Sequence, residues 1–268
     1  MALSNSDKKK YIEDVIVPSF MHIVEQKIFS TIYDYNYEVV IATNHTAQSV
    51  GFDSWQEVRG LGYKNYADSE LAARVFGASY NDKTRESIHK TIKIIYEIQQ
   101  LVFKSQKVVN FIDLLPYNNR FKAYLEIYIP LYHYNGEMIA IQSFSVPSKF
   151  FSHQDYLQQL TANDFHHKYM DQAKEVLTRR EHEIMFLLAN AISQEQIAQI
   201  LGVSRSTIAT IITKLSAKFG IPGSSTKLLG QIAIQHGYHQ DIPPSLYQPH
   251  IIILDDDILR ALQLDVQE

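Results

Sequence analysis

The polar residues between positions 204 and 218 have the types and spacing needed to contact a nucleic acid. Apolar residues recur every third or fourth position, which predicts a helix with one buried stripe, formed by Ile208, Ile212, Leu215 and Phe219. The opposite surface then carries Arg205, Ser206, Thr207, Ala209, Thr210, Thr213, Lys214 and Ala217. Arg205 can donate to guanine or phosphate, and Ser206 and Thr210 can bond the edges of bases. Ser204 and Thr207 stand at the helix start, where backbone N–H groups suit a phosphate.

The elements around this helix predict a helix-turn-helix. Capping boxes at 178–181 and 193–196, of the form Ser/Thr-x-x-Glu/Gln, each indicate the start of a preceding helix. The second of these helices should stop at Gly202, and one residue later Ser204 caps the next. So short a turn containing glycine is typical of the motif. A fourth helix, from about 225 to 236, would close the core.

A dense set of residues over 177–238 carries a family resemblance. They are Leu177-Thr178, Arg180-Glu181, Ile184, Leu187-Leu188, Ser193, Glu195, Ile197-Ala198, Leu201-Gly202-Val203-Ser204, Thr207-Ile208, Lys218, Gly220-Ile221, Ala233 and Gly237. In this order they resemble the DNA-binding domain of LuxR/GerE-type transcription regulators. The resemblance implies duplex DNA as the partner, and RNA polymerase is a further candidate partner. Together with the helix surface it predicts DNA contacts at Gln194, Ser204, Arg205, Ser206, Thr207, Thr210, Lys214 and Lys218.

Two positions depart from that family's pattern. The family usually has a cation near position 209 and often His at 211, whereas this chain has Ala209 and Ile211. Two expected backbone contacts are therefore absent, and non-specific affinity should be low. We expect binding as a homodimer, because two half-sites double the few base-reading side chains. The fourth helix is the predicted dimer interface, with Leu228, Ile232 and Gln235 near one face.

The first half of the chain predicts an α+β domain with an antiparallel sheet. Two short strands over 28–44 are joined across a turn at 34–36, and a long helix covers 84–103. A strand over 121–129 is followed by Asn135-Gly136, a hairpin dipeptide, and by a returning strand over 138–146. Phe121, Leu125 and Ile127 alternate with polar residues, so they should face the core and, under the long helix, a small apolar pocket.

This half resembles a PAS domain over 20–147. The residues that carry the resemblance are Asp34, Asn36, Val39-Val40, Ala42, Asn44, Ala47, Gly51-Phe52, Trp55, Glu57 and Gly60. It implies a sensory domain that controls the helix-turn-helix in response to an unknown small-molecule or protein signal. The chain is thus predicted to consist of an N-terminal extension (1–19), the PAS-like sensory and dimerisation domain (20–147), a helical connector (148–176), the DNA-binding domain (177–238) and an acidic C-terminal extension (239–268).

Composition narrows the remaining function classes. The chain has 268 residues, no Cys and a net charge of -4, so cysteine metal sites and cysteine nucleophiles are excluded. Residues 168–230 carry 8 Lys and Arg against 5 Asp and Glu, a modestly basic module between a near-neutral body and an acidic tail. No stretch approaches the roughly 20 apolar residues of a membrane span, and no apolar run follows Lys8–Lys10. We expect a cytoplasmic protein without a membrane partner.

Other candidate sites and functions rank lower. His166-His167 could suggest a metal, but adjacent helical residues point about 100° apart, so a solvated connector is favoured. His89 lies on the long helix, where haem-binding PAS relatives place their iron ligand, although lone histidines are usually not ligands. The cofactor is therefore unknown and no metal site is predicted. The alternative function is a protein-interaction adaptor with weak or no specific DNA binding, and an enzyme ranks last because no nucleophile–base pair or nucleotide loop is visible.

Overall fold

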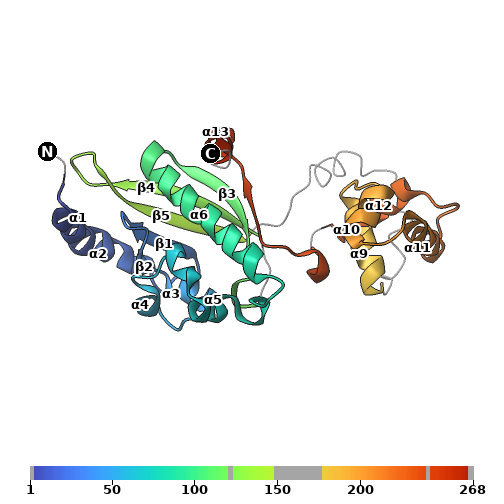
Figure 1. Cartoon of the computed structure of the whole chain (residues 1–268), viewed down its shortest axis with the longest axis horizontal. Coiled ribbons are helices and arrows are strands. Elements are labelled where there is room, and N and C mark those ends of the chain that lie inside the picture. Colours follow the sequence, from blue (N-terminus) through green and yellow to red (C-terminus); the bar gives the residue numbers. More distant parts are fainter. Residues whose placement is uncertain (1–2, 120–122, 148–176, 240–241, 265–268) are drawn as a thin grey trace. The chain divides into compact units, whose positions relative to one another are not determined.

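The computed structural model describes residues 3–119, 123–147, 177–239 and 242–264, which form two compact units (Figure 1). Unit 1 comprises Met1–Ser148 and Gln248–Glu268, and unit 2 comprises Lys149–Tyr247. The predicted connector at 148–176, with His166 and His167, lies outside the described residues, as does Phe121.

Unit 1 contains short helices, one long helix and a sheet. Its helical segments are α1 (Asn5–Tyr11), η1 (Ile12–Ile16), α2 (Val17–Phe20), η2 (Met21–Ile23), α3 (Asn44–Ser49), α4 (Trp55–Val58), η3 (Tyr63–Ala67), α5 (Ser69–Phe76), η4 (Gly77–Ser79), α6 (Arg85–Ser105), η5 (Tyr117–Asn119) and α13 (Asp256–Leu264). Its strands are β1 (Phe29–Asp34), β2 (Val39–Ala42), β3 (Val109–Leu114), β4 (Tyr124–Tyr132), β5 (Met138–Pro147) and β6 (His250–Ile253).

These strands form one antiparallel sheet in the described part of the chain, in the order β2-β1-β5-β4-β3-β6. The β1–β2 hairpin turns where Asp34 accepts a hydrogen bond from the backbone N–H of Asn36 at 2.8 Å. Helix α6 runs along one face of the sheet (Figure 1), and its residues Ile88, Ile92 and Ile95 are buried. The predicted α+β PAS-like fold is confirmed.

The face of β4 that turns inward is the opposite of the predicted one. Glu126 and Tyr128 are buried, at 8% and 0% exposure, whereas Leu125 and Ile127 are only half-buried on the other face. The prediction was wrong because alternation identifies two faces of a strand but not which one meets the core. On this inner face, Tyr124 and Glu126 line an internal cavity.

The end of the chain returns to unit 1 after unit 2. Strand β6 pairs antiparallel with β3, with Ile252 opposite Ile112, and extends the sheet at that edge. Ile251 on β6 and both Ile258 and Leu262 on α13 are buried in the core of unit 1. The C-terminal segment predicted as an acidic extension therefore contributes a strand and a helix to the sheet domain.

Unit 2 is helical in its described part. It contains α9 (Arg179–Ala189), α10 (Gln194–Leu201), α11 (Arg205–Lys218), α12 (Thr226–Gln235) and the short η6 (Pro244–Leu246). The capping boxes at Thr178 and Ser193 are both formed. The predicted stripe of α11 is buried in the core of the unit, so the helical prediction for this half of the chain is confirmed.

Candidate nucleic-acid interface and internal cavity

A tight turn presents the first residues of α11 at the surface of unit 2. Gly202 ends α10 in the left-handed conformation, with φ of 63°, which favours glycine. Ser204 then caps α11, and its Oγ accepts a hydrogen bond from the Thr207 N–H at 3.2 Å. The same Oγ lies 2.8 Å from the Ser206 Oγ and 2.9 Å from the Thr207 Oγ1. Three hydroxyls thus gather at the positive end of a helix dipole, an arrangement suited to a phosphate.

Arg205 forms an exposed ion pair with Glu195 of α10. Its Nε lies 2.8 Å from the Glu195 Oε1, and the two side chains are 69% and 57% exposed. Such a surface pair contributes only about 0–1 kcal/mol, since water competes for both charges. The guanidinium can therefore exchange this partner for a base or a phosphate, while Glu195 opposes the approach of a polyanion.

Thr210 and Thr213 on α11 each donate their hydroxyl proton to a backbone carbonyl, but their oxygens can still accept a hydrogen bond. Thr210 Oγ1 donates to the Ser206 carbonyl at 2.9 Å, and Thr213 Oγ1 donates to the Ala209 carbonyl at 3.0 Å. All four residues are exposed. Because a hydroxyl oxygen retains lone pairs, Thr210 can still accept from an adenine or cytosine amino group.

The two predicted lysines of α11 lie in different surroundings. Lys214 is exposed and has no ion pair among the residues that the structure describes. Lys218 Nζ lies 3.0 Å from Glu181 Oε2, and this pair joins the end of α11 to the start of α9. Partial burial raises the pKa of Glu181, but hydrogen bonds from Thr178 and Lys218 outweigh it and the net pKa is lowered. Lys218 therefore has a structural partner, whereas Lys214 is available to DNA.

The remaining predicted positions lie on α10 and α12. Gln194 opens α10 and is half-exposed. On α12, Leu228 and Gln235 are also half-exposed, but Ile232 is 2% exposed and belongs to the core of unit 2. The predicted dimer face is corrected on this point, because a side chain that fills its own core cannot also contact a partner.

Unit 1 contains a cavity of about 90 Å³ between the inner face of the sheet and the segments α3 to η3. Its aromatic lining consists of Phe29, Tyr33, Phe52, Tyr63, Tyr66, Tyr117 and Tyr124. Its polar lining consists of Thr31, Thr46, Ser49, Glu126, Ser143 and Ser145. Gly62 allows η3 to lie close to the β1–β2 turn, since a Cβ there would stand 2.4 Å from the Tyr37 carbonyl oxygen.

Two carboxyl groups lie in this interior. Burial, together with the charge of Asp113, raises the pKa of Glu126 to about 8. Burial likewise raises the pKa of Asp113 to about 7, against a hydrogen bond from the Tyr117 hydroxyl to its Oδ2 at 2.7 Å. The Asp113 Oδ1 is buried with no hydrogen-bond partner. Sequence reasoning missed both residues, although the polar side of the alternating strand at Tyr124, Glu126 and Tyr128 was a visible signal.

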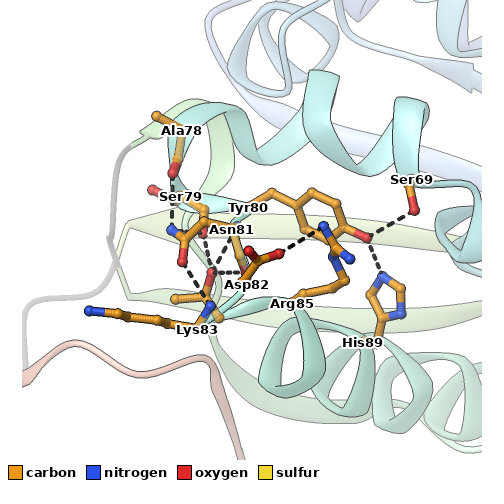
Figure 2. A network of polar contacts seen from close by, with 10 residues as sticks. Ser69, Ala78, Ser79, Tyr80, Asn81, Asp82, Lys83, Arg85 and His89 are labelled. Carbon is orange, nitrogen blue, oxygen red and sulfur yellow. Dashed lines mark hydrogen bonds and ion pairs between the residues drawn. The ribbon is translucent and has the colours of Figure 1, made fainter.

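His89 lies in a separate polar network at the start of α6 (Figure 2). Its Nε2 lies 2.9 Å from the Tyr80 hydroxyl and the two rings stack at 5.6 Å. Neither ring lines the cavity. No group of three or more His, Asp or Glu residues in the described ranges is arranged to hold a metal ion. Nor does any helix described by the structure have both the length and the apolar character to cross a bilayer.

Comparisons with known proteins agree with this geometry. Residues 175–226 match the family described as bacterial regulatory proteins, luxR family. The Vibrio cholerae VqmA structure, solved as a VqmA–ligand–DNA complex, is similar with a TM-score of 0.66 and 17% identity, covering 89% of this chain and 96% of that one. The phage VqmA–DPO complex is similar with a TM-score of 0.55 and 19% identity, covering 92% and 100%. No curated protein sequence matches.

The predicted LuxR/GerE-type domain is thus confirmed, and the two solved structures share the fold of this chain. The matched range contains α9, α10 and α11 with the turn between them. The family is one of regulatory proteins, in agreement with a non-enzymatic function.

Proposed function

We propose that this chain is a sequence-specific DNA-binding transcription regulator, because unit 2 carries a LuxR-family domain. The observation that carries the proposal is the exposed face of α11 in that domain, where Arg205 and Ser206 lie in the first turn and Thr210 lies one turn later. Recognition helices of this motif lie in the major groove and read bases with their first turns. A DNA target also implies a cytoplasmic location and allows RNA polymerase as a further partner.

The contacts divide into base reading and backbone holding. Arg205, Ser206 and Thr210 would face base edges, while Ser204 and Thr207 at the positive end of α11 would hold a phosphate. Lys214 supplies a further phosphate contact, and Gln194 at the start of α10 approaches the DNA backbone. Ala209 is exposed and uncharged, so affinity for random DNA should be weak.

The cavity of unit 1 is the proposed sensory site. The similar Vibrio cholerae protein was solved with a ligand and DNA, and the phage protein with DPO. A largely aromatic cavity with a few polar groups is the usual form of a small-molecule site. We propose that a small molecule bound there changes the affinity of unit 2 for DNA.

We propose a homodimer that also uses the outer face of the sheet. Leu125 pairs across to Val146, and Ile127 pairs across to Phe144, which makes a half-exposed apolar surface on the side away from the cavity. A surface of this kind often marks an interface. The half-exposed Leu228 of α12 is a second contact candidate, in the other unit.

DNA binding is tested with the full chain and a fluorescent duplex selected from a random library. We expect a selected duplex to bind at least about 1,000-fold more tightly than a random one. Lys214→Ala should weaken both, whereas the control Lys93→Ala, at an exposed position of α6 in unit 1, should change neither. If no duplex is enriched by the selection, the adaptor function replaces this proposal. Light scattering during size-exclusion chromatography gives the oligomeric state, and a strict monomer on the selected duplex excludes the dimer.

A further inference from the structure

The side chains around the cavity have an unusual charge balance. Glu126 lines the cavity directly, and Asp113 lies behind it on the neighbouring strand. No Lys, Arg or His lines the cavity in the part of the chain that the structure describes. We propose that the cavity binds a small organic cation, an ammonium or amidinium compound, with Glu126 as its counter-ion. This proposal rests on the sensory function proposed above and names the class of its ligand.

Among the residues that the structure describes, the groups that face Glu126 offer no positive charge. They are Tyr33 from β1, Tyr63 from η3, Asp113 from β3, Tyr117 after β3, Tyr128 from β4 and the Ser145 hydroxyl from β5. His45 packs against the lining residue Phe29, with ring centroids 4.5 Å apart, but it does not itself line the cavity. An ionised Glu126 would have no positively charged partner among these groups. Its carboxyl therefore stays protonated until a cation enters.

The aromatic rings complete a cation site. Several tyrosines surround the same space, and the faces of such rings attract a cation through their quadrupole. A carboxylate on one wall and aromatic rings on the others is the arrangement by which proteins recognise quaternary and protonated amines. An anionic ligand would instead meet two buried carboxyls and no compensating charge, which disfavours it.

The size of the cavity limits the ligand. A volume of about 90 Å³ corresponds to roughly six to nine water-sized groups, taking about 10–15 Å³ for each. A small amine of this size fits, and a haem or a flavin does not.

Two pairs of probes separate charge from shape. Choline and 3,3-dimethylbutan-1-ol have the same shape and differ by one positive charge, and n-butylammonium and butan-1-ol form a second pair that adds N–H donors. Binding of each to the full chain is measured by calorimetry at pH 6.5 in two buffers of different ionisation enthalpy. We expect at least one cation to bind ten-fold or more tightly than its neutral partner, with release of about one proton per cation bound.

Glu126→Gln should reduce the preference for the cation to near unity and abolish proton release. Glu86→Gln, an exposed glutamate at the start of α6, is the matched control and should retain both. If Glu126→Gln fails to fold, Tyr66→Leu provides the second test, since loss of a ring should weaken the cation more than the alcohol. Equal binding of cation and alcohol in both pairs, or an unchanged preference in the folded Glu126→Gln variant, overturns the proposal.

Duplex binding by the same samples separates this inference from the proposed function. Choline or butylammonium binding without any change in duplex affinity would leave the cation site standing and remove its regulatory function. Normal duplex binding with no cation preference would overturn the cation site alone.

Discussion

Replacing Glu126 by Gln should change how the stability of unit 1 depends on pH. The pKa of this carboxyl is raised from 4.5 to about 8 by burial, so the folded chain keeps a proton that the unfolded chain has released. Stability from this group is therefore complete below about pH 4.5 and is lost as the pH rises toward 8. Each such proton lowers the free energy of unfolding by about 1.4 kcal/mol per pH unit in this window.

Two groups act together in the wild type. Asp113, with its pKa raised from 3.8 to about 7, adds a second proton over much of the same range. Between pH 5.5 and 6.5 the wild type should therefore lose about 2.7 kcal/mol per pH unit and Glu126→Gln about half of that. The difference between the two slopes, about 1.4 kcal/mol per pH unit, is the quantity to measure.

Trp55 makes this measurement specific to unit 1. It is the one Trp of the chain, lies on α4 and is 9% exposed, so its fluorescence follows the unfolding of this unit. Urea titrations at several pH values between 5.5 and 8 give the free energy of unfolding. Glu86→Gln should keep the slope of the wild type. Parallel lines for the wild type and Glu126→Gln would refute the reasoning, because they would mean that Glu126 is already ionised in the fold.

Four further changes have defined outcomes. Arg205→Ala should cost about 1–3 kcal/mol of duplex affinity, with relaxed sequence preference if the guanidinium reads guanine, as a competition assay over point-substituted duplexes would report. Glu195→Gln should tighten duplex binding by up to about five-fold, because it frees Arg205 from a pair worth about 0.2–1 kcal/mol; equal or weaker binding in the same assay would contradict this. Lys214→Ala should reduce the magnitude of the log–log salt slope by about 1, and an unchanged slope would mean that this lysine contacts no phosphate. Removal of 248–268 should destabilise unit 1 by roughly 4.5–9 kcal/mol, at about 1.5–3 for each of three buried side chains, and Trp55 fluorescence in urea would detect any such loss.

The sequence by itself determined unit 2 almost completely. Each α-helix that the structure describes there begins at a capping residue whose side chain accepts a hydrogen bond from the backbone three residues later, as Ser193 does from Gln196. Each ends at a glycine or a short turn. These interactions are local, so they can be identified without knowledge of the rest of the fold. The buried stripe of α11 follows from the same periodicity, and the exposed face follows by subtraction.

Side-chain partners on that face required the structure. Arg205 meets Glu195, and Lys218 meets Glu181 across 37 positions of the chain. Periodicity shows that these residues are on the surface, but it does not show which charges face each other on neighbouring helices. The predicted DNA contacts are therefore unequal, with Lys214 available and Lys218 engaged.

In unit 1 the sequence determined the β1–β2 and β4–β5 hairpins and the long helix, while the tertiary structure decided which faces and edges meet. Glu126 turned inward because the packing of α6 and η3 over one face of the sheet selects the side of β4 that carries the carboxyl. Strand β6 pairs with β3 because the unpaired N–H and C=O groups of an edge strand can form hydrogen bonds with another strand, however distant in the chain. Contacts of this kind depend on the arrangement of whole elements, which no local pattern of residues encodes.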